Sequence, residues 1–422
     1  MPGLMTKEKE MLHLEHPISK LNSDINDIKN RENAWKCFVD MGFPSKRIEN
    51  WRYTDLASLY KKYAISQVKL GSNINVDYLV SLINLKTDVY NIVFIDGQLA
   101  YVDNIHGLNI CHISKCEHTP EYADALDYLN IAAYLGGVVI NVMENVKLSK
   151  PVLMTYLHTE NSREMVVNYK HSITLQENSE CLFFDHFMTL SDKASAANIC
   201  TDVTLKCAAK CTYDTMANMN LQKLLITHKL RVSVEYDAQY ETFQMGACLG
   251  LNRIDFDVDL KHAGAVFNAK GIYVVAHSAK VDYHFNVKHN ASNTGSNVSL
   301  QGIVGGKSSA TFNAKVYVAK GIKNVRALQN NRNIQLSKTA EINTKPELEI
   351  YSDDVVCSHG ATIGQLDQQA LFYLQSRGMN KDHASTLLIE GFVKELITLL
   401  DRDEKTITSY LKTVDGYIKH LF

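Results

Sequence analysis

The sequence lacks any apolar run long enough to cross a lipid bilayer, which takes about 20 residues in a helix. The best candidate, residues 134–143, is short and is interrupted by Gly136, Gly137 and Asn141. The first residues, MPGLMTKEKEMLHLEH, carry charges where a secretory signal peptide has an apolar core. We therefore expect a cytoplasmic protein with no membrane partner, whose nine cysteines stay reduced instead of forming a disulfide framework.

An excess of charge of one sign is also missing. Lysine and arginine number 44 against 46 aspartate and glutamate residues, so the formal charge is −2 and nothing indicates nucleic acid as a partner. The hydrophobic content of 45% is that of an ordinary globular protein. With 422 residues, the chain is long enough for two or three domains, or for one elongated domain with caps.

Proline is scarce between residues 137 and 366, where only Pro151 and Pro346 occur. Apolar and polar residues alternate with period two in this region, most clearly in RIDFDVDLK (253–261) and again in residues 281–288. AVFNAKGIYVVA (265–276) is echoed by ATFNAKVYVAKG (310–321), with 45 residues from Phe267 to Phe312. Short strands that repeat without intervening helices predict a solenoid or parallel β-helix over 137–366, although a β-sandwich fits the alternation as well.

The two ends of the chain have helical patterns. We expect residues 1–136 to be a mixed, mainly helical region. Asn22-Ser23-Asp24 caps a helix that carries Ile25, Ile28, Trp35 and Phe38 and ends at Gly42-Phe43-Pro44; a second helix covers 76–83, and 88–103 form a hairpin that turns at Asp96-Gly97.

Residues 367–422 are expected to form a C-terminal helical domain. Leu366, Ala370 and Leu374 have helical spacing before a stop at Gly378. Asn380 caps the next helix, whose expected buried residues are Ala384, Leu387, Leu388, Phe392, Leu396 and Leu399. This domain is too small for a large core of its own, so it should pack on the β region, on a partner, or on both.

Several motifs resemble sites but have simpler interpretations. GIVGGKSS (302–309) lacks the first glycine of a phosphate-binding loop, because that position is Gln301, and a strand pattern follows it where a helix is required. Asp255, Asp257 and Asp259 are interpreted as the solvent face of a strand, since they alternate with apolar residues. A zinc knuckle needs a second ligand pair, which is missing from the cluster of Cys111, His112, Cys116 and His118. We interpret three other cysteines as buried strand residues: Cys200, Cys207 and Cys211.

Two further segments combine unusual residues. RIENWRYTDL (47–56) is aromatic and charged, and its simplest interpretation is a connector in which Trp51 anchors a small domain. In DDVVCSHGATIGQLD (353–367), Cys357 and His359 are two residues apart and share one face of a strand. A thiolate and an imidazole suit iron or zinc, but two ligands do not complete a site.

The C-terminal residues carry a family resemblance. Residues 345–396, from KPELEI to FVKEL, closely resemble the signature of the SufB/SufD family of iron–sulfur cluster assembly proteins, and CSHGAT (357–362) resembles its SufD form. Residues 312–350 resemble the last coils of the family's β-helix, and ENWRYTDL (49–56) resembles its N-terminal motif. The resemblance implies a right-handed parallel β-helix between N-terminal and C-terminal helical regions.

The resemblance also implies a function as a non-catalytic scaffold. It implies a complex of SufB, SufD and two copies of the ABC-type ATPase SufC, in which SufB and SufD pair through their β-helices. The family's SufD-side cluster residue is the histidine of CSHGAT, here His359, which would share a transient iron–sulfur cluster with SufB; Cys357 is a weaker candidate. This chain has no Cys₄ set with ferredoxin-like spacing, so a half-site completed by a partner is a reasonable expectation.

The expected SufC-binding surface lies on the last helices, around Phe372, Tyr373, Arg377 and Phe392. ATP would be bound by SufC and not by this chain, and no dinucleotide fingerprint supports a flavin. A homodimer is plausible when SufB is absent, because paired β-helices can be isologous. The alternatives are a β-helix carbohydrate-active enzyme, such as a lyase or esterase, and a purely structural repeat protein.

Overall fold

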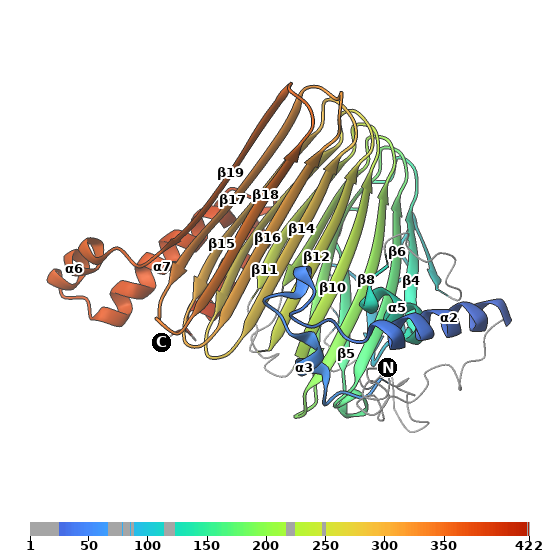
Figure 1. Cartoon of the computed structure of the whole chain (residues 1–422), viewed down its shortest axis with the longest axis horizontal. Helices are drawn as coiled ribbons and strands as arrows, with labels where there is room; N and C mark the ends of the chain where they lie inside the picture. Colours follow the sequence, from blue (N-terminus) through green and yellow to red (C-terminus); the bar gives the residue numbers. More distant parts are fainter. Residues whose placement is uncertain are drawn as a thin grey trace, which may run out of the picture.

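The computed structural model describes residues 25–65, 88–113, 123–216, 224–246 and 250–419, together with 78, 85 and 421. Within them the molecule is an elongated solenoid of parallel strands with helices at both ends (Figure 1). This confirms the predicted mainly β fold, and it excludes the β-sandwich, whose sheets are antiparallel. None of the helices in the described residues is long and apolar enough to cross a membrane.

Two long sheets form the solenoid, and successive strands alternate between them. Each strand from β4 onward pairs in parallel with the strand two places further along, so every pair of strands completes one coil. The first sheet contains β1 Tyr90–Ile95, β2 Gln98–Val102, β5 Val152–His158, β7 Glu180–Thr189, β9 Lys210–Met216, β11 Gln239–Gly246, β13 Val266–Val275, β15 Gly295–Val304, β17 Val325–Gln335 and β19 Val355–Gly364. The second sheet contains β3 Leu108–His112, β4 Gly136–Val142, β6 Val166–Leu175, β8 Ser195–Leu205, β10 Leu224–Val234, β12 Leu251–Leu260, β14 Lys280–His289, β16 Ser309–Val318 and β18 Glu341–Ile350.

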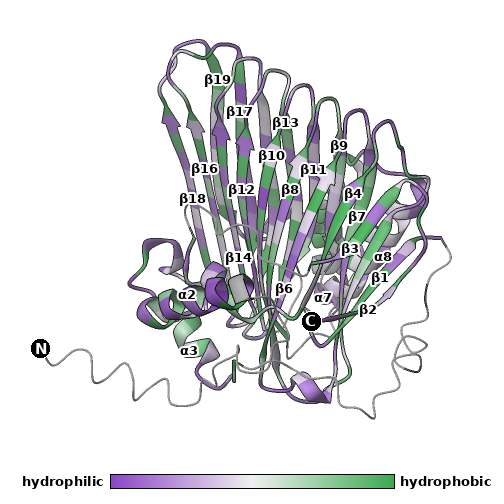
Figure 2. Ribbon diagram, turned by 90° about the vertical axis from the view of Figure 1, so that its right-hand side faces the viewer, coloured by the Kyte–Doolittle hydropathy of each residue, from purple (hydrophilic) through white to green (hydrophobic). Residues whose placement is uncertain are grey.

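Inward-facing side chains of the two sheets form the core. Hydrophobic and polar residues alternate along the strands, as Figure 2 shows, and one set of each strand is buried. Phe256 pairs in register with Phe285, and their rings stack with centroids 5.1 Å apart. These two residues are 29 positions apart in the sequence, so one coil takes 29 residues here.

The repeat of 45 residues noted in the sequence is therefore not the coil length. Phe267 lies on β13 of the first sheet, whereas Phe312 lies on β16 of the second. The two segments look alike because strands of both sheets face the same core with the same alternation. GIVGGKSS spans the end of β15, a turn and the start of β16, so the predicted strand after the glycines is confirmed.

The N-terminal helices lie against the second sheet. They are α2 Ile25–Met41, the 3₁₀ turn η2 Glu49–Trp51, α3 Leu56–Tyr60 and α5 Ala125–Ala133; a further 3₁₀ turn, η3 Glu160–Ser162, follows β5. The predicted helix is confirmed as α2, which ends at Met41 directly before Gly42, and it buries Trp35 and Phe38. The predicted hairpin is also confirmed, since β1 and β2 pair antiparallel around Asp96 and Gly97, both of which have positive φ. The Asn22-Ser23-Asp24 cap and nearly all of the helix expected at 76–83 lie outside the described residues.

The C-terminal helices follow the last coil, and the second and third of them pack on the opposite, first sheet (Figure 1). They are α6 Gln368–Ser376, α7 Lys381–Thr398 and α8 Glu404–Lys419. Gly378 has φ +93° just after α6, and the Asn380 side chain accepts a hydrogen bond from the backbone N–H of His383, so the predicted stop and cap are confirmed.

The predicted buried face of α7 is wrong in part. Leu387 and Leu399 are 46% and 64% exposed, and Leu388 and Phe392 are only half-buried. The helix instead buries a stripe with three- and four-residue spacing, made of Ala384, Ser385, Ile389, Val393, Leu396 and Ile397. A helix turns by 100° per residue, so Leu387 and Leu399 lie about 200° around the helix from Ile389 and Ile397. Apolarity alone had placed them in the core.

Buried histidines inside the solenoid predict a stability that depends on pH. Burial lowers the pKa of His158 and of His289 to about 4, and it lowers the pKa of His171 well below its ordinary value. The unfolded chain therefore binds protons on these rings below about pH 6.5 while the folded chain does not. The free energy of unfolding should fall by about 1.4 kcal/mol per pH unit for each ring as the pH drops from 6.5 toward 4.

Urea unfolding of the full chain between pH 7.5 and pH 5 measures this slope. His158→Gln should make the slope shallower, because it removes one of the three rings. A free energy of unfolding that stays constant over this range would contradict the prediction.

Candidate functional site

Strand β19, which carries Cys357 and His359, is the last strand of the first sheet. It pairs in parallel with β17, and within the described residues no strand lies on its other side. Strand β18 ends the second sheet in the same way. The solenoid is thus open at this end, and the N–H and C=O groups along one edge of each terminal strand are available to another chain.

Cys357 and His359 both face the interior of this open end. Cys357 lies in register with Ala327, which is buried in the core, and the half-buried Cys357 packs against that core. His359 lies in register with the buried Gln329 and is itself exposed. The two residues therefore share one face of the strand, as their spacing predicted, at the mouth of the solenoid.

The two side chains differ in how well they suit a metal. Burial raises the pKa of the Cys357 thiol, which disfavours the thiolate that binds metals. His359 is open to a ligand or partner. The arrangement offers one accessible imidazole with a protonated thiol beside it, which is a partial ligand set that other donors would have to complete.

Most of the residues predicted to bind the ATPase are exposed on α6. Phe372 and Tyr373 are 73% and 57% exposed, and the guanidinium of Arg377 lies 5.3 Å from the centre of the Tyr373 ring. Phe392 differs, because it is half-buried and packs against the guanidinium of Arg332 at 5.2 Å. Figure 1 shows α6 at the far end of the C-terminal helices, projecting away from the sheets. These exposed aromatic side chains form a surface suited to a protein partner.

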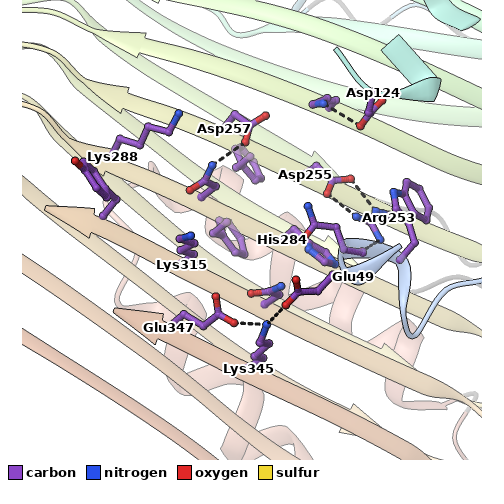
Figure 3. Close-up of a pocket in the computed structure, with 18 of the residues that line it drawn as sticks. Glu49, Asp124, Arg253, Asp255, Asp257, His284, Lys288, Lys315, Lys345 and Glu347 are labelled. Carbon is purple, nitrogen blue, oxygen red and sulfur yellow. Dashed lines mark hydrogen bonds and ion pairs between the residues drawn. The ribbon is translucent and has the colours of Figure 1, made fainter. Parts of the chain in front are cut away.

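A cleft also lies on the outward face of the second sheet. It has a volume of about 390 Å³ and is covered on one side by residues 49–51 (Figure 3). Its floor holds Asp255 and Asp257, which are half-buried and not the free solvent face that alternation suggested. Asp255 accepts two 2.8 Å hydrogen bonds from Arg253, and Asp257 accepts one from Asn286.

The charges in this cleft hold the N-terminal segment to the solenoid. The Arg253 guanidinium lies 3.6 Å from the Trp51 ring centre and donates to the backbone oxygen of Asn50. Arg253 also pairs with Asp282, which accepts a 2.5 Å hydrogen bond from Thr54. We call residues 49–54 the N-terminal clasp.

The ion pair between Arg253 and Asp282 lies beneath the clasp. Burial would raise the pKa of Asp282, but Arg253 and His284 outweigh it and keep that pKa well below its usual range. The prediction that Trp51 anchors this connector is confirmed, with Trp51 only 4% exposed.

A second ionic contact, missed in the sequence, attaches the C-terminal helices to the first sheet. The Asp214 carboxylate on β9 is fully buried and accepts hydrogen bonds from Arg402 at 3.0 and 3.2 Å. It also accepts from the Tyr410 hydroxyl at 2.5 Å and from the backbone N–H of Phe243 at 2.7 Å. These partners lie up to 196 positions away in the sequence, so no local pattern indicates them.

The remaining cysteine predictions have mixed outcomes. Cys111 is exposed on β3, while Cys116 and His118 lie outside the described residues. Cys200 and Cys211 are buried strand residues as predicted, but Cys207 is half-buried in the turn between β8 and β9, so its assignment to a strand is wrong. In the part of the chain that the structure describes, no three His, Cys, Asp or Glu side chains converge as a metal site would require.

Comparison with known proteins agrees with the sequence resemblance. Residues 157–392 match the family described as "SUF system FeS cluster assembly, SufBD core domain", and residues 16–154 match "SufBD protein N-terminal region". The iron–sulfur cluster assembly protein SufD of Escherichia coli (strain K12) is 28% identical over 382 residues, which cover 86% of this chain and 86% of that protein. An iron–sulfur cluster assembly SufBD family protein of Synechocystis sp. is 24% identical over 396 residues, covering 88% of this chain and 86% of that protein.

The core-family match alone extends over more than half of the 422 residues and includes the whole solenoid from β6 to β19. It also includes CSHGAT at the open end, while the N-terminal match includes the clasp. The chain therefore belongs to the SufBD family of iron–sulfur cluster assembly proteins and is SufD-like.

Proposed function

We propose that this chain is a non-catalytic scaffold subunit of a cytoplasmic SUF assembly complex of the form SufB–SufC₂–SufD, in which it takes the SufD position. The observation that carries the proposal is the placement of His359. This imidazole is exposed on the terminal strand β19, beside a strand edge that a second chain can reach. If His359 binds a metal here, donors from a partner chain can complete the ligand set.

The open end of the solenoid supports pairing with a SufB-like sister scaffold. Strands β18 and β19 offer two adjacent backbone edges, and extended segments bind such edges through main-chain hydrogen bonds. Val356 and Ile363 on β19 are 64% and 47% exposed, so a partner there would also bury apolar surface. In the absence of the sister, a second copy of this chain could occupy the same edges as a homodimer.

The cluster is the cargo of this complex and not a resident cofactor. His359 would contribute one ligand to a transient iron–sulfur cluster shared with the sister subunit, and Cys357 is the weaker second donor because its thiol is half-buried. A cluster that must be passed on is better held by few ligands from two chains than by a closed Cys₄ site.

The exposed surface of α6 supports binding of an ABC-type ATPase of the SufC type. Tyrosine and arginine, as in Tyr373 and Arg377, are among the residue types that dominate binding energies at protein interfaces, and phenylalanine, as in Phe372, is enriched there. The ATPase would bind the nucleotide. This chain would transmit the movement of the ATPase to the open end of the solenoid. A flavin is not part of the proposal, because the sequence carries no dinucleotide fingerprint.

We expect the double variant Phe372→Ala/Tyr373→Ala to weaken ATPase binding by at least about tenfold, because each truncated aromatic anchor typically costs more than 1 kcal/mol. The test co-expresses the tagged chain with its sister scaffold and ATPase, and measures subunit stoichiometry and ATPase affinity. Tyr236→Ala is the matched control, since Tyr236 is also an exposed aromatic residue, at 53%, but lies in a turn between β10 and β11.

The wild-type chain should recover the sister subunit and two ATPase copies. Failure to bind either protein would sink the proposed function, and release of sugar from polysaccharides by the chain alone would favour the β-helix enzyme instead. If the α6 variant and the Tyr236 control bind the ATPase equally well, the scaffold role stands and the assignment of α6 is wrong.

A further inference from the structure

Gln329 lies directly beside His359 in the last coil. Strands β17 and β19 are parallel, and the register pairs Gln329 with His359. Neighbouring strands are about 4.8 Å apart, and paired residues of parallel strands point to the same side of the sheet. The side chain of Gln329 is therefore the neighbour of His359 on the interior side of the sheet.

The NH₂ group of the Gln329 carboxamide has a hydrogen-bond partner, whereas its oxygen has none. The residue is 3% exposed, and its amide nitrogen donates to the backbone oxygen of Glu347 on β18 at 3.4 Å. A carbonyl oxygen accepts only, so the NH₂ group must face Glu347 and the carboxamide oxygen must face elsewhere. That oxygen is buried and has no hydrogen-bond partner among the described residues.

Two neighbouring carboxamides of β17, those of Asn331 and Asn333, do not share this property. Asn331 accepts a 2.7 Å hydrogen bond from Asn333, and Asn333 accepts one from the Tyr273 hydroxyl. The amide of Asn333 also donates to the backbone oxygen of Thr362 on β19 at 3.2 Å. Of these three carboxamides, that of Gln329 is the one whose oxygen has no partner, and Gln329 is the residue in register with His359.

A neutral imidazole is a matching donor, because one ring nitrogen carries a proton while the other accepts or binds a metal. We propose that Gln329 is a positioning residue for His359: its carboxamide oxygen accepts the hydrogen bond of one ring N–H and so fixes the tautomer that presents the other nitrogen to iron. This inference rests on the proposed function. It follows the rule that histidine ligands donate their second N–H to a protein acceptor, whose loss typically weakens metal binding by about 10–100-fold.

Three variants test the inference in the complex with the sister scaffold and the ATPase. Gln329→Met keeps the length of the side chain and removes the acceptor, whereas Gln329→Glu keeps an acceptor oxygen. Gln301→Met is the matched control, because Gln301 is also buried with an unpartnered carboxamide oxygen but is in register with Arg332, on the outward side of the sheet.

Two readouts are needed. Anaerobic titration with Fe²⁺ gives the affinity of the complex. Long-range ¹H–¹⁵N spectra of the histidine-labelled full chain report the tautomer of His359, whose signals are assigned by their loss in His359→Ala. We expect Gln329→Met to weaken Fe²⁺ binding about 10–100-fold and to mix the two tautomers, whereas Gln329→Glu and Gln301→Met retain the wild-type tautomer.

Unchanged affinity and tautomer in Gln329→Met, together with loss of Fe²⁺ binding in His359→Ala, would overturn the positioning role and leave the proposed function intact. Equal losses in Gln329→Met and Gln301→Met would overturn it too, because they would indicate general damage to the core. If His359→Ala itself binds Fe²⁺ normally, the inference and the ligand assignment on which it rests are both wrong.

Discussion

Replacing His359 by alanine is expected to remove most of the iron and acid-labile sulfide from the complex while the subunits stay assembled. His359 is exposed on the open end of the solenoid, so the substitution leaves no cavity in the core and breaks none of the strand pairing of β19. What is lost is one metal ligand. We expect the cluster content to fall by about tenfold or more, since loss of even an outer-shell partner of a metal ligand typically weakens metal binding by about 10–100-fold.

The measurement compares iron, sulfide and subunit stoichiometry in wild-type and variant complexes that are purified anaerobically. His106→Ala is the control, because His106 is also exposed but precedes β3 at the opposite end of the solenoid. Cys357→Ser should have a smaller effect, since the Cys357 thiol is half-buried and its pKa is raised. A His359 variant with normal iron and sulfide would leave the scaffold role in place and remove His359 from the ligand set.

Replacing Asp214 by alanine is the second change with a large expected effect. It removes the fully buried one of the two carboxylates that pair with the Arg402 guanidinium, whose side chain is 5% exposed, and leaves only the partly exposed Glu241 at 3.1 Å. It also removes the acceptor of the Tyr410 hydroxyl. Breaking a buried ion pair on one side typically costs about 3–5 kcal/mol when the remaining charge has no other partner. Because Glu241 still pairs with Arg402, we expect a loss near the lower end of that range.

Urea unfolding of the isolated chain measures the loss of stability, and limited proteolysis between β19 and α8 shows whether the helices detach from the first sheet. The double variant Asp214→Leu/Arg402→Met is the control, since removing both charges avoids a stranded ion and should recover most of the stability. If the single variant is as stable as the wild type, Asp214 does not anchor the helices.

The sequence predicted local features well because their causes are local. The turn at Asp96-Gly97, the stop at Gly378 and the cap at Asn380 each follow from the backbone preferences of one or two residues. Alternation in residues 253–261 indicated a strand whose apolar side faces a core. The spacing of Cys357 and His359 alone predicted that they share one face of a strand. Their location at the open end of the solenoid could not be predicted in this way.

Features set by distant residues could not be predicted from such patterns. The coil length depends on which strands pair, and the pairs Phe256–Phe285 and Gln329–His359 join residues about 30 positions apart. In the sequence Arg253 is indistinguishable from an ordinary surface arginine. Its burial depends on the segment that contains Asn50, which is 203 positions away. The identity of His359 as a candidate ligand came from the family resemblance, because a Cys-x-His pair on a strand does not by itself indicate a metal.

The course of the C-terminal helices affects how the solenoid unfolds. A repeat protein in which each coil touches only its neighbours can lose its end coils one at a time. Here the chain leaves the last coil after β19 and returns along the first sheet. The Lys270 amine on β13 donates to the backbone oxygen of Leu399 at 2.6 Å. Arg402 forms ion pairs with Glu241 on β11 and with Asp214 on β9. The last coil is therefore linked to coils in the middle of the molecule without passing through the ones between. Fraying of the open end must disturb those inner coils as well, so the end that offers its edges to a partner opens more cooperatively than the end of a simple repeat array.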